Sequence, residues 1–335
     1  IQNLNVEIQK RQETCDKLKL NLERSNISYD TLWQWKTRKV EILKDEKQKR
    51  EPLEKIHDSA VADVYKSSLL AGEYLNSQTK SNIPIPDTFS NIPNYCFSKY
   101  KITSITLPST VKTIGHFAFD HCDSLASLII PTSVTFIGVH AFSWCALKHV
   151  EIPRSVSYLG SYAFSYCESL ENFDLPPSVT FVGDGVLFGC AHLTSLTLPN
   201  SLTYIPASFA ARCASLSVID IPSSVIAIRE YAFAKCSSLT TVTMVSVKSI
   251  EKNAFSKCSS LTNINLPSTL TDIYACAFQS CASLTSITIP SSVLFIGSNA
   301  FRECSHLLPF SIPASVKYIG ENIFLKCKVP PEPNE

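Results

Sequence analysis

Apolar residues recur along most of the chain in a fixed pattern of about 23 positions. Residues 117–138 read FAFDHCDSLASLIIPTSVTFIG, and the two stretches that follow repeat the same Ala-Phe, Cys, Leu, Ser-Val and Gly positions. A repeat of this length predicts a solenoid, in which each copy forms one coil that stacks on the next. Ten cysteines mark the period at intervals of 22 or 23 residues: Cys122, Cys145, Cys167, Cys190, Cys213, Cys236, Cys258, Cys281, Cys304 and Cys327.

Within one repeat the pattern predicts a short strand followed by turns. Residues 284–289 read LTSITI, and this alternation of apolar and polar side chains is typical of a half-buried strand. Pro290 has no N–H group and therefore ends the strand. Ile296 and Gly297 predict an apolar anchor with a flexible turn, and the Ala-Phe pair and the cysteine close the coil.

Because the coils stack, each inward position becomes a column along the solenoid. We expect the phenylalanine and cysteine columns to form the core, since both residue types are often buried. The coil before Cys213 inverts the usual order and reads Phe209-Ala210, so its packing is not defined by the pattern. The phenylalanine column holds Phe97, Phe119, Phe142, Phe164, Leu187, Phe233, Phe255, Phe278, Phe301 and Phe324.

These columns resemble the BspA-like leucine-rich repeat family, whose pattern Leu-Pro-x-Ser-Val-x-x-Ile-Gly-x-x-Ala-Phe-x-x-Cys stands nearly whole in most coils. The resemblance covers about residues 80–327. It implies a curved, right-handed leucine-rich-repeat superhelix with short parallel strands, of about eleven coils when counted on the phenylalanine column. The family is used for adhesion or protein binding, and the resemblance implies no catalytic residues and names no partner.

The cysteine column admits two interpretations. Neighbouring strands lie about 4.8 Å apart, so geometry alone allows disulfides between consecutive coils. Cysteine is also a small hydrophobic residue, and one copy per coil is typical of a core column. We expect reduced core thiols, with disulfides as the alternative.

The sequence carries no pattern typical of catalysis or metal binding. Zinc sites use close cysteine pairs, whereas this chain has one cysteine per coil. The seven histidines occupy mostly different positions of the repeat, and no HExxH, GxSxG or P-loop motif occurs. We therefore expect no enzyme, no metal and no cofactor.

The net charge of +1 gives no overall field that would recruit nucleic acid or an anionic membrane. Charge is concentrated at the start, where residues 1–55 hold 13 Lys and Arg and 10 Asp and Glu. The basic excess in residues 36–50 is interleaved with acids, which favours a solvated helix over a nucleic-acid site. No stretch reaches the roughly 18 apolar residues of a spanning helix.

Residues 1–53 predict a charged helix with coiled-coil heptads. Its apolar seam favours a homodimer or pairing with a different helix, although Arg11 and Ser25 interrupt the seam. Residues 54–79 predict an amphipathic capping helix and linker, and residues 328–335 form a Pro-rich tail after the solenoid at 80–327. The proposed oligomerisation seam consists of Ile1, Leu4, Ile8, Leu18 and Leu22.

Outward positions of the predicted strands are mostly small hydroxyls or amides, but the coils over residues 144–174 differ. Aromatic side chains beside polar groups are typical of interface hot spots, although ordinary solvated side chains are the alternative. The candidate partner-binding residues are Trp144, His149, Glu151, Tyr166, Asn172, Asp174 and Asp220.

Together these patterns predict a non-catalytic interaction scaffold, with a protein partner on the solenoid face and an N-terminal helix that oligomerises or docks. A cell-surface adhesin is the alternative. Reduced cysteines and the absence of an N-x-S/T sequon from residues 80–335 favour the cytoplasm. The sequence begins at Ile1 without a signal segment, and this leaves both settings open.

Overall fold

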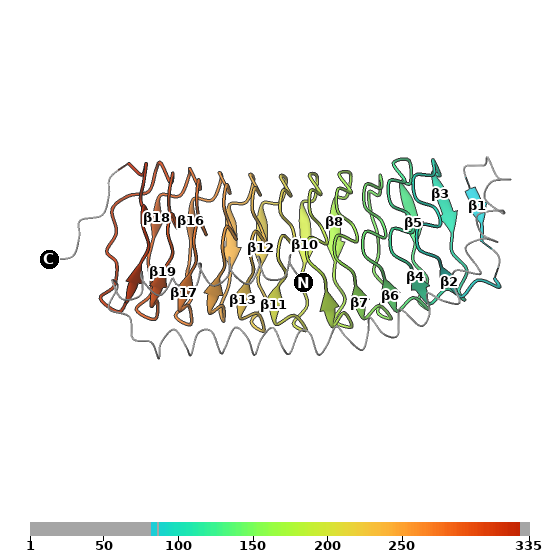
Figure 1. Cartoon of the computed structure of the whole chain (residues 1–335), viewed down its shortest axis with the longest axis horizontal. Coiled ribbons are helices and arrows are strands. Elements are labelled where there is room, and N and C mark those ends of the chain that lie inside the picture. The colour runs from blue at the N-terminus through green and yellow to red at the C-terminus, as the bar shows by residue number, and fades with distance from the viewer. Residues whose placement is uncertain (1–81, 86, 329–335) are drawn as a thin grey trace, which may run out of the picture. The chain divides into compact units, whose positions relative to one another are not determined.

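Two stripes of short parallel strands run along the solenoid, as Figure 1 shows for the computed structural model. The structure describes residues 82–328 except residue 86, so the helices predicted for residues 1–53 and 54–79, and nearly all of the tail, lie outside it. The first stripe contains β1 (Asn82–Pro84), β3 (Ser104–Thr106), β5 (Ser127–Ile129), β8 (Asn172–Asp174), β10 (Ser195–Thr197), β12 (Val218–Asp220), β14 (Thr241–Thr243), β16 (Asn263–Ile264) and β18 (Ser286–Ile287).

The second stripe has one strand in every coil and gives the clearest count of the turns. Its eleven strands start 22 or 23 residues apart, so ten full turns separate the first from the last. These strands are β2 (Asn91–Ile92), β4 (Thr113–Ile114), β6 (Phe136–Ile137), β7 (Tyr158–Leu159), β9 (Phe181–Val182), β11 (Tyr204–Ile205), β13 (Ala227–Ile228), β15 (Ser249–Ile250), β17 (Asp272–Ile273), β19 (Phe295–Ile296) and β20 (Tyr318–Ile319).

The first stripe corresponds to the strand predicted from the alternating apolar positions, and β18 confirms it within residues 284–289. The second stripe lies at the Ile-Gly position of the repeat, where the sequence pattern predicts an apolar anchor and a turn but no strand. Each of its strands is two residues long, which is too short to show an alternating pattern.

The coil after Cys145 has no first-stripe strand. Only one residue separates Cys145 from Leu147, whereas the other regular coils have two. The backbone still bridges its neighbours, because Lys148 N donates to Ala126 O at 3.3 Å and Glu171 N donates to Lys148 O at 3.1 Å. The missing residue thus removes the strand but keeps the stacking of the coils.

Pro206 explains why the second stripe is divided into a five-stranded and a six-stranded sheet between β9 and β11. In neighbouring coils the residue after the strand donates its N–H to the coil before it, as Gly183 N does to Leu159 O at 2.8 Å. Proline has no N–H, so the equivalent bond to Val182 cannot form.

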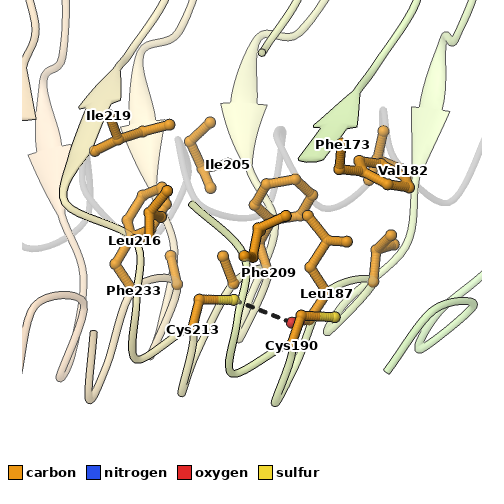
Figure 2. Close-up of a cluster of buried hydrophobic side chains, with 14 of the residues drawn as sticks. Phe173, Val182, Leu187, Cys190, Ile205, Phe209, Cys213, Leu216, Ile219 and Phe233 are labelled. Atoms are coloured by element: carbon orange, nitrogen blue, oxygen red, sulfur yellow. Dashed lines mark hydrogen bonds between the residues drawn. The ribbon is translucent and has the colours of Figure 1, made fainter. Parts of the chain in front are cut away.

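Phenylalanine rings stack along the core in two runs. Ring centroids are 4.9–5.2 Å apart from Phe97 to Phe164 and 5.5–5.9 Å apart from Phe233 to Phe324. Between the runs the column holds Leu187 and Ala210, and the inverted coil buries Phe209 completely (Figure 2). The inversion therefore keeps an aromatic ring in the core of that coil.

The cysteine column lies in the core as free thiols, so the burial prediction is confirmed. Of its ten members all are buried except Cys327, which is half-buried, and none is in a disulfide. Each thiol donates to a main-chain carbonyl of the preceding coil, as Cys213 does to Leu187 O at 3.3 Å (Figure 2). The carbonyl belongs to the phenylalanine column, which ties these two columns together from coil to coil.

In several coils the serine of the Pro-x-Ser-Val pattern has a similar role, whereas the hydroxyls of Ser178 and Ser224 are buried without a hydrogen-bond partner among the described residues. Ser155 Oγ donates to Val134 O at 2.6 Å, and Ser292 Oγ donates to Leu270 O at 2.7 Å. Each hydroxyl satisfies a main-chain carbonyl of the coil before it. The repeated motif is thus explained by hydrogen bonding between coils as well as by packing.

Candidate binding surface

Every coil places two residues at positive φ, four positions apart, in the turn that leads to the cysteine. Hydrogen bonds between coils hold this left-handed backbone, as Trp144 N donates to Ser165 O at 2.9 Å. The first αL column is Tyr95, Phe117, His140, Tyr162, Gly185, Ser208, Tyr231, Asn253, Cys276, Asn299 and Asn322. The second αL column is Lys99, His121, Trp144, Tyr166, Gly189, Arg212, Lys235, Lys257, Ser280, Glu303 and Lys326.

Left-handed backbone is unfavourable for residues with a Cβ, and aromatic residues are unusual there. The side chains nevertheless gain a regular arrangement, because equivalent positions of adjacent coils are separated by one strand spacing of about 4.8 Å. That spacing suits face-to-face contact of flat rings. Aromatic residues in one αL column therefore stack.

Three residues of the second αL column form what we call the second ladder. The ring centroids of His121 and Trp144 are 5.6 Å apart, and those of Trp144 and Tyr166 are 4.0 Å apart. Phe188 then meets Tyr166 edge-on at 5.3 Å. The side chain of Trp144 is 41% exposed, so a large aromatic edge faces solvent while its faces are occupied.

The first αL column carries a matching first ladder of Tyr95, Phe117, His140 and Tyr162. Successive ring centroids are 4.8, 4.9 and 5.0 Å apart. The last ring, that of Tyr162, also meets Phe188 edge-on, at 6.2 Å. Both ladders therefore end on the same phenylalanine.

Gly185 and Gly189 make room for the ends of the ladders. A Cβ at Gly185 would collide with the ring of Tyr162, and a Cβ at Gly189 would lie 2.7 Å from Cδ1 of Tyr166. The neighbouring coils tolerate side chains at both αL positions, so the conformation does not require glycine there. The glycines are needed because the tyrosine rings lie over them.

A buried polar network lies under the ladders and fixes His140. Ser143 and Ser165 are buried, their hydroxyls are 2.8 Å apart, and Ser143 Oγ donates to Tyr162 O at 2.9 Å. Because Ser143 has a single proton, Nδ1 of His140 must donate in its 2.8 Å contact with Ser143 Oγ. Burial lowers the pKa of His140, opposed by the nearby Asp120 carboxylate, and His121 lowers it further.

The acidic neighbour of the second ladder is Asp120, whose carboxylate lies 2.9 Å from Nδ1 of His121. His121 is half-exposed, while the carboxylate is largely covered. The pair orients the imidazole that stacks on Trp144. The second ladder thus begins with a ring held by a charged contact.

The structure divides the seven candidate partner-binding residues into two groups. Trp144 and Tyr166 contact each other in the second ladder. The polar candidates are exposed and lie along the first stripe: His149 and Glu151 in the coil without a strand, Asn172 and Asp174 on β8, and Asp220 on β12.

His149 and Asp220 each contact a residue of a neighbouring coil. His149 Nε2 lies 3.9 Å from Glu171 Oε2, and both side chains are more than half exposed. Asp220 accepts a hydrogen bond from Thr243, its register partner on β14. These are solvated contacts, and pairs of this kind contribute little to stability.

The sequence interpretation did not include the first ladder, Phe188 or the two glycines. A signal for the ladder was present, because the residue two positions before the column phenylalanine is Tyr, Phe, His and Tyr in four consecutive coils. Comparing equivalent positions between coils would have found it. The role of Gly185 and Gly189 could not be found this way, since it depends on where two rings lie.

Within residues 82–328 no group of three or more His, Cys, Asp or Glu side chains is placed to hold a metal ion. In the same part of the chain, no helix has the length and apolar character needed to cross a membrane.

Comparison with protein families gives one matching model, the BspA type leucine rich repeat region. It matches in six copies, at residues 73–146, 90–213, 135–246 and 205–330. The matches together cover more than half of the chain. No curated protein matches the chain.

Several solved structures share the fold. A leucine rich cell surface protein from Faecalibacterium prausnitzii is 27% identical, with a TM-score of 0.53, and the match covers 75% of this chain and 80% of that one. A leucine-rich repeat protein from Bacteroides ovatus is 25% identical, with a TM-score of 0.51 and coverage of 73% and 84%. One from Eubacterium ventriosum, at 21% identity, TM-score 0.50 and coverage of 76% and 84%, shows the fold alone.

Proposed function

Because the chain belongs to the BspA-type leucine-rich repeat family, we propose that its solenoid is a non-catalytic surface that binds a protein ligand at the cell surface. The observation that carries the proposal is the second ladder. It presents the edge of Trp144 to solvent between two stacked neighbours.

A pre-ordered aromatic side chain is well suited to binding. Its neighbours already restrict the ring of Trp144, so little conformational freedom is lost when a ligand covers it. Tryptophan and tyrosine are enriched among the few residues that dominate interface energies. The second ladder therefore supplies the anchor in this proposal.

The polar residues of the first stripe supply selectivity. Most outward positions of this face are small hydroxyls or amides, and the ionisable residues His149, Glu151, Asp174 and Asp220 depart from that pattern. The amide of Asn172 lies on the same strand as Asp174. Exposed charges of this kind affect the choice of partner and the association rate more than the affinity.

One observation favours the cell surface, and a second removes the argument for the cytoplasm that the free cysteines first suggest. The Faecalibacterium prausnitzii relative is described as a cell surface protein. Burial also raises the pKa of the Cys167 and Cys236 thiols to about 12, and a buried protonated thiol reacts poorly with oxidants. Free cysteines in this core are therefore compatible with an oxidising environment.

The N-terminal residues have a separate role in the proposal. The seam of Ile1, Leu4, Ile8, Leu18 and Leu22 joins copies of the chain or docks a different helix. Joining copies would multiply the binding surface, because linked sites bind with a higher effective concentration.

The experiment is to identify extracellular proteins that bind the full chain and to measure their affinity for two variants. We expect Trp144→Ala to weaken binding by at least about tenfold, since it removes the aromatic anchor. The paired change Glu151→Ala and Asp174→Ala removes the charges that steer the ligand, and we expect slower association.

The matched control is Ser286→Ala with Thr288→Ala, in the same outward positions three coils beyond Asp220. Thr243 is unsuitable as a control because it donates to Asp220. A ligand that binds all of these variants as it binds the parent chain would place the binding surface elsewhere.

A further inference from the structure

The second αL column changes character after Gly189. Three consecutive coils carry a cation there, at Arg212, Lys235 and Lys257, and all three side chains are exposed. The spacing between stacked coils places the backbones of successive members about 4.8 Å apart along the solenoid. We call these three residues the cationic row.

Within the described part of the chain, no ion pair involves Arg212, Lys235 or Lys257. Like charges in register on adjacent strands destabilise a sheet. The three cations occupy equivalent positions of adjacent coils, so their mutual repulsion is destabilising in the same way. Farther along the same column the charges are compensated, since Lys326 Nζ lies 3.1 Å from Glu303 Oε1.

One end of the row is held in place. The guanidinium carbon of Arg212 lies 5.4 Å from the ring centroid of Phe188, where the two ladders end. A cation over an aromatic face is stabilised by the ring quadrupole. Arg212 is therefore oriented before any ligand arrives.

The residues that follow the row in sequence carry exposed hydroxyls. The two residues after each cysteine in these coils include the exposed Ser237, Ser238 and Ser259. Ser237 Oγ donates to Ala214 O at 3.4 Å, and Ser259 Oγ donates to Ser237 O at 3.3 Å. Because these protons are used internally, the hydroxyl lone pairs remain to accept hydrogen bonds from a ligand.

We propose that the cationic row binds a linear anionic polysaccharide, with a carboxylate or sulfate group on its sugars. The cations meet the acidic groups, and the neighbouring serines accept from the sugar hydroxyls. One pyranose unit is about as long as the spacing between coils, so successive acidic sugars match successive cations. This ligand is distinct from the protein bound through Trp144.

The geometry favours a glycan over other anionic polymers. In an extended acidic peptide, side chains on one face recur every two residues, at about 6.6 Å, which does not match a 4.8 Å row. Single-stranded nucleic acid binds by stacking its bases on aromatic faces, but the faces of Trp144 and Tyr166 are occupied by each other. A duplex or a membrane would contact a broad basic surface, whereas this row is one residue wide and the net charge is +1.

The test measures binding of the full chain to immobilised heparin, polygalacturonate and neutral dextran. We expect binding to one or both anionic glycans, weakened by salt, and none to dextran. The triple variant Arg212→Gln, Lys235→Gln, Lys257→Gln should lose about tenfold or more in affinity, since it removes the charge complementarity. Lys235→Glu alone, at the centre of the row, should also weaken binding.

The control is Lys101→Gln, Lys112→Gln, Lys317→Gln, which removes the same charge from exposed positions outside the row. We expect it, and Trp144→Ala, to bind glycan like the parent chain. Equal affinity of the row and control variants would overturn the proposal, as would binding to neither glycan. Binding of poly-glutamate or single-stranded DNA as tight as that of the glycans would overturn the assignment to a polysaccharide.

Discussion

At the residue scale, each column thiol combines packing with hydrogen bonding. Each thiol fills core volume and donates to a carbonyl of the preceding coil, as Cys236 does to Ala210 O at 3.2 Å. Burial is the main cause that raises the pKa of this thiol to about 12. Cys236 is therefore protonated and reacts poorly in the folded chain.

Thiol titration tests this description. The chain contains thirteen cysteines, and we expect the denatured protein without reductant to release close to that number of free thiols. The native protein should expose very few, because the column is buried. Disulfides between consecutive coils, detected by mass spectrometry of peptides, would contradict the free-thiol core.

The raised pKa values also predict a loss of stability in alkali. The ordinary thiol pKa is 9.0, whereas those of folded Cys167 and Cys236 are about 12. Above pH 9.0 the unfolded chain releases thiol protons that the folded chain retains, so the free energy of unfolding falls from there to about pH 12. This contribution is fully present at neutral pH.

Thermal unfolding measured from neutral pH to about pH 11 in the presence of reductant should therefore show a falling midpoint. The double variant Cys167→Ala, Cys236→Ala should start from a lower midpoint and fall less steeply, because it has fewer buried thiols. A midpoint that stays constant above pH 9.0 would show that the thiols titrate normally.

At the element scale, hydrogen bonds between coils decide where strands and turns form. Pro206 interrupts the second stripe because it lacks one N–H, and the missing residue before Leu147 removes a first-stripe strand. The αL turns occur in every coil despite their different side chains, and in every coil but the last their N–H groups donate to the next coil. Local residue preference is secondary in this fold.

This explains which elements the sequence predicts. The inward columns and the first stripe follow from periodicity, which the repeat shows directly. The second stripe is too short to produce a period, and nothing about Trp144 or Lys235 indicates a left-handed backbone. The αL conformation comes from contacts one coil away, which no single repeat contains. The right-handed sense and the curvature stay predictions.

The candidate site shows the same division. The sequence indicates Trp144 and Tyr166 as aromatic neighbours of polar strand positions, and the structure shows that their rings stack on each other. Their contact follows from equivalent positions in adjacent coils. The short sequence distance between Trp144 and His149 does not reveal that these residues belong to different columns.

Gly185→Ala tests whether the ladders depend on the space that glycine leaves. The new Cβ would collide with the ring of Tyr162, so we expect a loss of about 1–3 kcal/mol in the free energy of unfolding. Chemical denaturation measures it. Ser208→Ala is the matched control, because the same column of the next coil already carries a Cβ at positive φ. An equal effect of the two changes would show that the tyrosine ring moves away without cost.

At the scale of the whole molecule, a solenoid is stabilised by contacts between neighbouring coils. Here those contacts are the ring stacks, the thiol and serine hydrogen bonds, and the two strand stripes. The same stacking turns a variable position into a column, which is how the ladders and the cationic row arise. Each proposed binding feature is therefore formed by equivalent positions of successive coils.

Deletion of residues 1–53 tests the proposed division of labour between the two parts of the chain. We expect the full chain to self-associate and the shortened chain to be monomeric, because the heptad seam has been removed. Light scattering reports both masses. Equal masses would rule out self-association through this seam.

Trp144 can report directly whether a protein ligand covers the second ladder. The chain has three tryptophans, so the variant Trp33→Phe, Trp35→Phe leaves Trp144 as its only one. Iodide quenching of its fluorescence is measured with and without the bound ligand. We expect the ligand to shield the 41% exposed indole and to lower the quenching. Unchanged quenching at saturating ligand would contradict it.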